Sequence, residues 1–327
     1  MKAILYRRCG PARDVLDLVD LPVPEPGPGE VLVQVEASGV NPHDVKKRSG
    51  WLGAPPPDCG VVPHSDGAGI IAACGPGVDT GRLGARVYFG GAGPTRGAAA
   101  EFCALPATHV FDLPAALNFD QGASLGVPAF TAWLAVLQGG GVTGDTVLIN
   151  GGSGAVGRVA VEMASWNGAT VIATAGTPDR CDIARAKGAT HVLTYRDPDL
   201  ANRILDLTDG RGVDRIVEVD LAANMATDAA VIAAHGTICA YSSTSDRTPV
   251  LPYYEFALKG IALRFIQASR MRPVVRATAA RAIGALLDRG RIAPDVAQIV
   301  ELADCAMAHE AVENGLAGAN VTVKGGR

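Results

Sequence analysis

The chain has 327 residues, of which 48% are hydrophobic and 19% charged, and its formal net charge is −4 at pH 7. This composition indicates a globular protein long enough for two domains and excludes a disordered chain. The small negative charge argues against a general binder of nucleic acid or membrane surfaces.

The location of the protein is predicted from its apolar segments and its cysteines. The first eight residues end in two arginines without a long apolar core, so no signal peptide is expected. No apolar run reaches the ~20 residues of a membrane-spanning helix. The seven cysteines are scattered without a C-x-x-C motif, which fits neither a disulfide framework nor a zinc site. We therefore expect a cytoplasmic protein with reduced cysteines.

The first 120 residues carry β-type patterns interrupted by proline and glycine. Residues 30–38 alternate as a strand does, after a proline-rich surface connection. Further short strands are expected near residues 70–73, 86–89 and 101–105, and a short helix over residues 41–48.

From about Gln121 the pattern changes to alternating strands and helices. Strands are predicted at residues 147–150, 171–175, 192–194, 215–219, 237–241 and 261–265. The helices between them are predicted at residues 156–166, 180–187, 200–206 and 225–234. This order predicts a doubly wound parallel sheet, and therefore an α/β protein.

The last part of the chain is predicted to contain two helices and one strand. The helices extend from Pro273 to about Arg289 and over residues 305–314, and the strand covers residues 321–324. We expect this closing strand to pair with the β-rich N-terminal part.

A glycine-rich turn joins the first strand of the α/β region to its helix. Gly152, Gly154 and Gly157 have G-x-G-x-x-G spacing, and Gly151 completes a G-x-x-G-x-x-G pattern as well. Such glycines allow a tight turn, close approach to a pyrophosphate and close packing of helix on strand. The helix N-terminus adds N–H groups and a positive dipole end. With a second strand at the expected distance, this turn predicts a dinucleotide site.

The end of that second strand favours NADPH over NADH. NAD sites usually place an acidic residue there to bind the ribose hydroxyls, whereas this strand ends in small residues. Arg180 follows and is suited to bind a 2′-phosphate. The alternative is that Arg180 is a solvated residue, partly neutralised by Asp179.

Several segments in this order carry a resemblance to a known family. They are Gly39-Val40-Asn41-Pro42 with Arg48-Ser49-Gly50, residues 63–69, Phe130-Thr131-Ala132-Trp133, residues 151–157, Ala175-Gly176-Thr177 and residues 222–243. Over its whole length the chain resembles the medium-chain dehydrogenase/reductases, and among them the zinc-independent NADPH:quinone oxidoreductases and zeta-crystallins. The resemblance implies a GroES-like substrate domain over residues 1–121 and 268–327, and a Rossmann domain over residues 122–267. It also implies a homodimer.

The resemblance argues against a catalytic zinc. Zinc-containing members carry a cysteine where this chain has Asn41 and a histidine where it has Ser65. A catalytic zinc needs three protein ligands, so we expect no metal. An unusual site made of His43, His64 and Asp66 is the alternative. Without a metal, the substrate must accept hydride readily, as a quinone or a conjugated carbonyl does.

The resemblance also implies which residues hold the cofactor. The turn would bind the pyrophosphate through the backbone N–H groups of Ser153, Gly154, Ala155 and Val156. The end of the second strand would bind the 2′-phosphate through Gly176, Thr177 and Arg180, and Tyr195 would lie beside the adenosine. Asn224 would contact the cofactor, and the nicotinamide would be contacted by Ala240, Tyr241, Ser242, Ser243, Phe265 and Gln267. For Tyr195 the alternative is a buried structural side chain, and for Asn224 a helix N-cap.

Three residues are predicted to take part in the chemistry. Asn41 would orient the substrate oxygen, and Thr131 would bond near the nicotinamide ribose or carboxamide. Lys46 stands where the quinone reductases usually have a tyrosine, and would contact a carbonyl oxygen or be a solvated lysine. Trp51 would form an aromatic wall or belong to the core. Asp44 is expected to cap or to pair with cations.

Two tyrosines, Tyr253 and Tyr254, are expected to pack in an ordinary structural role rather than line the pocket. The predicted function is hydride transfer from NADPH to a small-molecule quinone, with no nucleic acid or membrane as partner. The alternatives are reduction of an enone or enal double bond, or a zeta-crystallin-like binding or structural role. The intact glycines favour catalysis.

Overall fold

The computed structural model describes residues 1–315 and 319–326, and the chain divides into two compact units. Unit 1 comprises Met1–Val127, Arg272–Asp288 and Ala293–Arg327. Unit 2 comprises Pro128–Met271 and Arg289–Ile292.

Unit 2 is built on a parallel sheet, which in the described residues has six strands in the order β10-β9-β8-β11-β12-β13. The strands are β8 (Thr146–Ile149), β9 (Thr170–Ala175), β10 (His191–Thr194), β11 (Val213–Glu218), β12 (Ile232–Ala240) and β13 (Ala262–Phe265). The order reverses between β8 and β11, as in a Rossmann fold. The predicted doubly wound sheet is confirmed.

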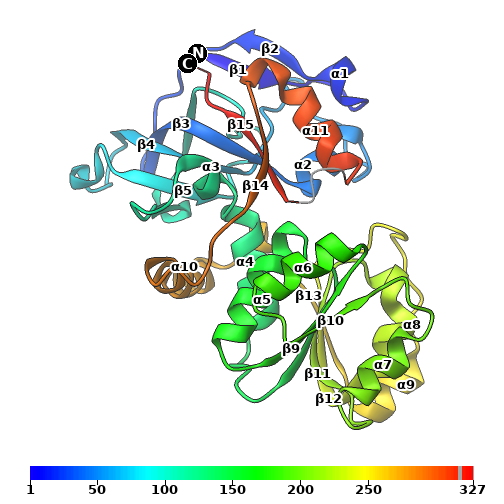
Figure 1. Ribbon diagram of the computed structural model, residues 1–327. Coiled ribbons are helices and arrows are strands. Elements are labelled where there is room, and N and C mark those ends of the chain that lie inside the picture. The colour runs from blue at the N-terminus through cyan, green and yellow to red at the C-terminus, as the bar shows by residue number, and fades with distance from the viewer. Residues whose placement is uncertain (316–318, 327) are drawn as a thin grey trace. The chain divides into compact units, whose positions relative to one another are not determined.

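Helices cover both faces of this sheet (Figure 1). On one side are α5 (Ala155–Trp166) and α6 (Pro178–Ala186). On the other side are α7 (Leu200–Asp206), α8 (Leu221–Val231) and α9 (Tyr253–Lys259). The helix α4 (Gly126–Val136) precedes β8.

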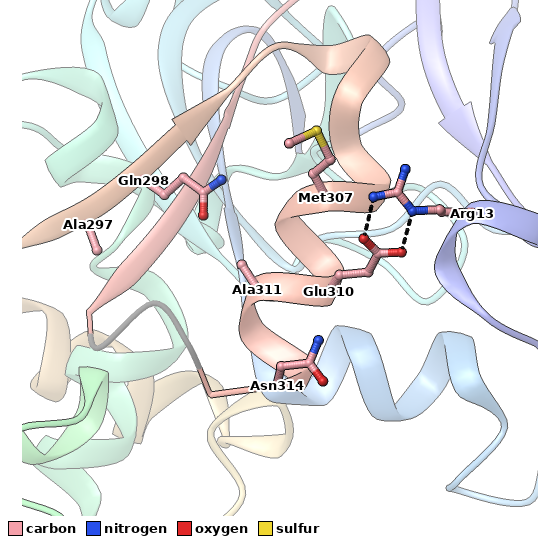
Figure 2. Close-up of a pocket in the computed structure, with 7 residues that line it drawn as sticks. All are labelled: Arg13, Ala297, Gln298, Met307, Glu310, Ala311 and Asn314. Atoms are coloured by element: carbon pink, nitrogen blue, oxygen red, sulfur yellow. Dashed lines mark hydrogen bonds and ion pairs between the residues drawn. The ribbon is translucent and has the colours of Figure 1, made fainter.

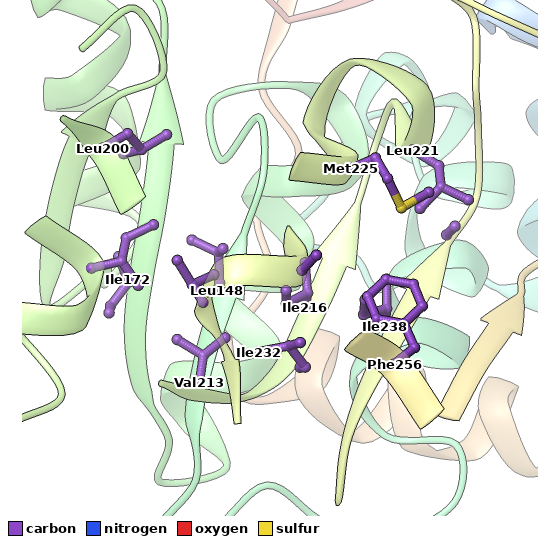
Figure 3. Packing of buried hydrophobic residues seen from close by; sticks show 14 of the residues in the cluster. Leu148, Ile172, Leu200, Val213, Ile216, Leu221, Met225, Ile232, Ile238 and Phe256 are labelled. Carbon is purple, nitrogen blue, oxygen red and sulfur yellow. The ribbon is translucent and has the colours of Figure 1, made fainter. Parts of the chain in front are cut away.

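The apolar core of unit 2 explains why its strands are continuous hydrophobic runs. Figure 3 shows Leu148, Ile172 and Ile216 of the strands facing side chains from the helices, among them Leu200 and Phe256. A strand covered on both faces has no solvent side, so alternation with polar residues is lost.

One predicted boundary in unit 2 is wrong. The helix expected over residues 225–234 is α8, which begins at Leu221 and ends at Val231, and β12 follows at once from Ile232. Residues 229–234 are apolar throughout, so they fit both the helical and the strand periodicity. The chain adopts a strand from Ile232 onward because Ile232 pairs with Val213 of β11.

Unit 1 holds a mainly antiparallel sheet, which in the described residues has seven strands in the order β14-β15-β3-β4-β5-β7, with β6 paired to β3. The strands are β3 (Glu30–Val40), β4 (Asp66–Cys74), β5 (Arg86–Gly90), β6 (Phe102–Pro106), β7 (Val110–Asp112), β14 (Val296–Val300) and β15 (Asn320–Lys324), and beside them β1 (Lys2–Leu5) pairs with β2 (Asp17–Asp20). The predicted pairing of the last strand with the N-terminal part is confirmed, because β15 is antiparallel to β3.

The helices of unit 1 are α1 (Ala12–Val15), α2 (Pro42–Ser49), α3 (Phe119–Ala123), α10 (Pro273–Asp288) and α11 (Cys305–Glu313). Helix α11 packs over an apolar cluster that includes Ile4, Val40 and Val321. Among the described residues, no helix combines the length and the apolar character needed to cross a membrane.

Candidate active site

The predicted cofactor residues follow the carboxyl ends of the strands of unit 2. Ser153 to Val156 follow β8, Gly176 to Arg180 follow β9, and Tyr195 follows β10 directly. Asn224 lies in the first turns of α8 after β11, and the remaining predicted residues follow β12 and β13. Because the strands are parallel, these segments all lie at one edge of the sheet, where such sheets bind ligands. We call this edge the carboxyl edge.

The glycine turn owes its shape to two of its glycines. Gly151 has a φ of +72°, which L side chains rarely adopt. A Cβ on Gly157 would lie 2.1 Å from the carbonyl oxygen of Gly151, so only glycine allows α5 to begin this close to the turn. Gly154 is the N-cap of α5, and the first N–H groups of a helix have no partner within it. The turn therefore presents N–H donors to an anion.

The end of β9 carries the features expected around a 2′-phosphate. Thr177 caps α6, its hydroxyl accepting the backbone N–H of Arg180 at 3.4 Å. Arg180 is half-buried in the first turn of α6, and Asp179 beside it is exposed. No acidic residue stands between Ala175 and Asp179.

Tyr195 lies beside this end of the sheet. A Cβ on Gly176 would lie 2.3 Å from the Tyr195 hydroxyl, so the ring is packed against the Gly176 backbone. The side chain is nonetheless 49% exposed, and the alternative of a buried structural tyrosine is wrong. Arg196 places its guanidinium 5.9 Å from the centre of the Tyr195 ring, a cation–π distance.

Asn224 is held by a buried carboxylate. Its amide Nδ2 donates to Glu218 Oε1 at 2.8 Å. Helix α8 is capped by Asp220, so the alternative that Asn224 is the N-cap is wrong. The helix begins four residues earlier than its apolar pattern indicated, which places Asn224 within its first turns.

Sequence reasoning missed a buried polar network under the glycine turn. Asn150, the residue before Gly151, donates from Nδ2 to Glu218 Oε2 at 2.5 Å and to Asp228 Oδ1 at 3.1 Å. Its Oδ1 accepts the Thr174 hydroxyl at 3.2 Å. Burial, together with the charge of Glu218 and a hydrogen bond to it, raises the pKa of Asp228 well above its ordinary range. The network therefore disfavours a negative charge on both acids at once, and its hydrogen bonds fix the end of β8.

The residues predicted near the nicotinamide differ in exposure. Ala240 is buried, the next three residues are half-buried, and Phe265 is 75% exposed. Gln267 is exposed as well, while the N–H of Ile266 donates to the Ala240 carbonyl at 2.8 Å. Thr131 is buried on α4.

In unit 1, Asn41 lies between β3 and α2 and is buried. It caps α2, and its backbone N–H donates to Asp44 Oδ2 at 2.9 Å. The expected capping by Asp44 is thus observed. The Asp44 carboxylate also accepts the N–H of Ser65 at 3.2 Å.

Asp66 determines how the Asn41 amide is oriented. Asp66 Oδ2 accepts Asn41 Nδ2 at 2.8 Å and the Val127 N–H at 2.7 Å. The carboxyl is fully buried, and burial raises its pKa to about 8 although both hydrogen bonds favour the charged form. The sequence suggested Asp66 only as a metal ligand, since the contact with Asn41 is made between separate elements.

Lys46 is half-buried, with its Nζ 4.8 Å from the centre of the Trp51 ring. This cation–π geometry is more specific than that of a solvated lysine. Trp51 is half-buried, so it is not a core residue.

The expected packing role of Tyr253 and Tyr254 is wrong. The two side chains are 71% and 77% exposed and contact each other edge-on, with ring centres 5.3 Å apart. They lie at the start of α9, whose buried face is formed by Phe256 instead.

The residues around Asn41 do not fit a catalytic zinc. The Asn41 amide and the Ser65 hydroxyl are used in hydrogen bonds to Asp66 and Asp44. Within residues 1–315 and 319–326, His43, His64 and Asp66 do not bring their ligand atoms together either.

A hollow of about 450 Å³ on unit 1 is lined by none of the predicted site residues (Figure 2). Two of its lining residues form a two-bond ion pair, in which Arg13 Nε and Nη2 donate to Glu310 at 2.7 and 2.8 Å. This pair fastens α11 to the helix α1 region.

Comparison with known proteins places the chain in a family. Residues 27–115 match the family model for the alcohol dehydrogenase GroES-like domain, and residues 155–284 match the model for zinc-binding dehydrogenases. The quinone oxidoreductase of Sus scrofa is 31% identical over 296 residues, which cover 89% of this chain and 87% of that protein.

Two solved structures have a similar fold over nearly all of both chains. A NAD-dependent alcohol dehydrogenase is 29% identical with a TM-score of 0.88, covering 100% of each chain. The mycobacterial protein Rv1454c, complexed with NADPH, is 28% identical with a TM-score of 0.88, covering 99% of this chain and 100% of that one. With a GroES-like unit, a Rossmann unit and relatives of this similarity, the chain belongs to the medium-chain dehydrogenase/reductase family and is related to its quinone oxidoreductases.

Proposed function

We propose that the chain is an NADPH-dependent reductase that delivers hydride to a quinone without a zinc ion at the reacting centre. The observation that carries this proposal is the end of β9, where an arginine stands in the first turn of α6 and the three residues directly after the strand are not acidic. The NADPH complex of Rv1454c and the similarity to a quinone oxidoreductase support it.

The carboxyl edge fits NADPH along its length. The N–H groups of Ser153, Ala155 and Val156 would hold the pyrophosphate, while the Gly154 N–H donates to the Gly151 carbonyl at 2.9 Å and shapes the turn. Arg180 and Thr177 would hold the 2′-phosphate. Tyr195 would lie beside the adenosine. Asn224 and the residues at the ends of β12 and β13 would lie toward the nicotinamide. When bound, the nicotinamide supplies the hydride. We assign the cofactor to residues 122–267 and the acceptor to residues 1–121 and 268–327.

Asn41 and Lys46 would contact the acceptor. Asp66 holds one N–H of the Asn41 amide, which directs the amide and leaves its second N–H to donate to a quinone oxygen. Lys46 would stabilise the negative charge that develops on that oxygen as hydride arrives. Protonation of the resulting anion from solvent completes the hydroquinone, so no general acid is required.

The substrate assignment is tested by NADPH consumption with a panel of small quinones and a panel of enones and enals. We expect the quinones to have the higher kcat/KM and simple alcohols not to be oxidised. Asn41→Ala should lower turnover, whereas Asn202→Ala, at an exposed asparagine on α7, should not. Faster turnover of an enone than of any quinone would assign double-bond reduction instead, and inactivity with both panels would favour a binding or structural role.

We further propose a cytoplasmic homodimer formed through the α9–β13 face. Val250 precedes α9, Leu258 lies on α9 and Phe265 ends β13, and the three residues are 86%, 87% and 75% exposed. In the described residues β13 pairs only with β12, which leaves a strand edge beside these apolar side chains. An exposed edge next to an apolar patch is a typical protein interface, and a second copy supplies a matching edge. The seven unpaired cysteines fit a reducing compartment.

A further inference from the structure

Three metal-ligating side chains meet in the interior of unit 1, outside the site described above. They are His64, from the segment before β4, and Cys305 and His309, one turn apart on α11. All three are buried, and their ligand atoms lie within 4.8 Å of one another. Cys305 and His309 have i, i+4 spacing, which places both on the same face of the helix.

The distances are close to those of ligands that share one metal ion. His64 Nε2 lies 3.1 Å from His309 Nε2 and 3.7 Å from Cys305 Sγ. With usual zinc bond lengths, two nitrogen ligands of a tetrahedral ion lie about 3.3 Å apart, and a nitrogen and a sulfur about 3.6 Å apart. Both separations from His64 therefore differ from the tetrahedral values by only about 0.1–0.2 Å. The ligand atoms of Cys305 and His309 lie within 4.8 Å of each other, so these two side chains close by up to about 1.2 Å on a shared ion.

The surroundings prepare His64 to act as a ligand. Its Nδ1 is 2.9 Å from the Ser38 hydroxyl, a contact that orients the ring and leaves Nε2 toward Cys305 and His309. Burial lowers the pKa of His64 to about 4 and the pKa of His309 well below its ordinary range, so both rings are neutral and carry a lone pair. His64 also has a φ of +72°, a left-handed conformation that is unfavourable for histidine. Strain of this kind persists where the surrounding structure requires it.

Nearby charges partly balance the charge that such an ion would bring. The Asp44 carboxylate acts electrostatically on His64 and Cys305. The positive charge of the Arg48 guanidinium acts to lower the pKa of His309, whereas Asp44 acts to raise the pKa of its neighbours. Arg48 is itself paired with Glu313 at 2.7 Å. A zinc ion with one thiolate leaves a net charge of +1 facing Asp44.

We propose that His64, Cys305 and His309 form a structural binding site for a zinc ion, which ties α11 to the segment before β4. On binding, Cys305 loses its thiol proton to solvent and its thiolate coordinates the ion, as do the two His Nε2 atoms, with water completing the tetrahedron. This inference departs from the sequence-based expectation of no metal. It is independent of the proposed function, which concerns the residues around Asn41.

Metal content and spectroscopy of the whole protein test the site. Protein produced in zinc- or cobalt-supplemented medium and desalted in the presence of chelator should retain about one ion per chain. The cobalt form should show a thiolate-to-cobalt charge-transfer band together with the visible bands of tetrahedral cobalt. Cys305→Ser should remove the charge-transfer band, and His309→Gln should reduce retained metal to less than about a tenth.

Two matched variants control for general effects. Cys103→Ser changes another buried thiol of unit 1, and His109→Gln changes a half-buried histidine of the same unit, and both variants should retain the metal. His64→Gly relieves the left-handed strain but also removes a buried ring and its polar contacts, so the comparison is the change in melting temperature that added zinc produces in each protein. With the site, His64→Gly should abolish the stabilisation that zinc gives the wild type. If wild-type protein holds no cobalt and shows no charge-transfer band, the proposal is overturned, whatever the variants do.

Discussion

Among single residues, Arg180 is expected to determine the preference for NADPH over NADH. It stands in the first turn of α6, and the loss of one hydrogen bond to a charged group costs about 1.5–3 kcal/mol. We therefore expect Arg180→Ala to weaken NADPH binding by about tenfold or more while NADH binding stays nearly constant. Titration of cofactor fluorescence measures both constants.

Arg185 provides the control for this experiment. It is an exposed arginine on the same helix, paired with Asp182 at 2.5 Å, so Arg185→Ala removes an equal charge away from the strand end. This variant should bind both cofactors as the wild type does. Equal losses for NADPH and NADH in Arg180→Ala would contradict the assignment of Arg180 to the 2′-phosphate.

Lys46 is the second residue with a separable prediction. If its ammonium contacts the acceptor, Lys46→Met should lower kcat/KM for the quinone and leave the NADPH dissociation constant unchanged. Methionine keeps much of the packing against Trp51 but removes the charge. Lys47→Met, at the neighbouring lysine, is the control in the same kinetic assay. A silent Lys46→Met variant would show that the lysine only packs on Trp51.

At the scale of elements, α5 begins so close to the glycine turn that a side chain at Gly157 should destabilise the protein, whereas one at Gly284 in α10 should not. Gly157→Ala would place a methyl group 2.1 Å from the Gly151 oxygen, so α5 must shift. We expect a loss of about 1–3 kcal/mol in the free energy of unfolding. NADPH and NADH binding should weaken by the same factor, because the turn serves the pyrophosphate that both share.

Gly284 provides the opposite case in helix α10. A Cβ added there meets nothing within 4 Å, so Gly284→Ala should raise the free energy of unfolding by roughly 0.5–1 kcal/mol. Urea denaturation of both variants measures the two effects. A neutral Gly157→Ala variant would show that the turn accommodates a side chain and that its glycine spacing is not required.

At the scale of the whole molecule, the α9–β13 face predicts the oligomeric state. Leu258 is 87% exposed on α9, and a carboxylate placed there should oppose burial against a second copy. We expect Leu258→Glu to convert a dimer into a monomer in sedimentation experiments. Leu83→Glu, at an exposed leucine of unit 1, should leave the dimer intact. A wild-type monomer would exclude the proposed dimer.

The sequence alone determined the class of fold and the family. The signals are local: the strand and helix periodicities, the glycine turn after the first strand and the order of the family segments. Each can be recognised without knowing which segments pack together. The doubly wound sheet and the return of the last strand to β3 followed from them. The boundaries of the strands were harder to predict, as the junction of α8 and β12 shows, because a continuous apolar run fits both the helical and the strand periodicity.

Only the tertiary structure decided which polar side chains meet. Asn150 and Asp228 are 78 residues apart, and His64 and His309 are 245 apart, yet each pair is within hydrogen-bonding distance. No periodicity along the chain reports such contacts, because they arise when strands and helices from distant segments pack together. The orientation of Asn41 by Asp66, the paired acids under the glycine turn and the buried histidines therefore became visible only in the folded chain.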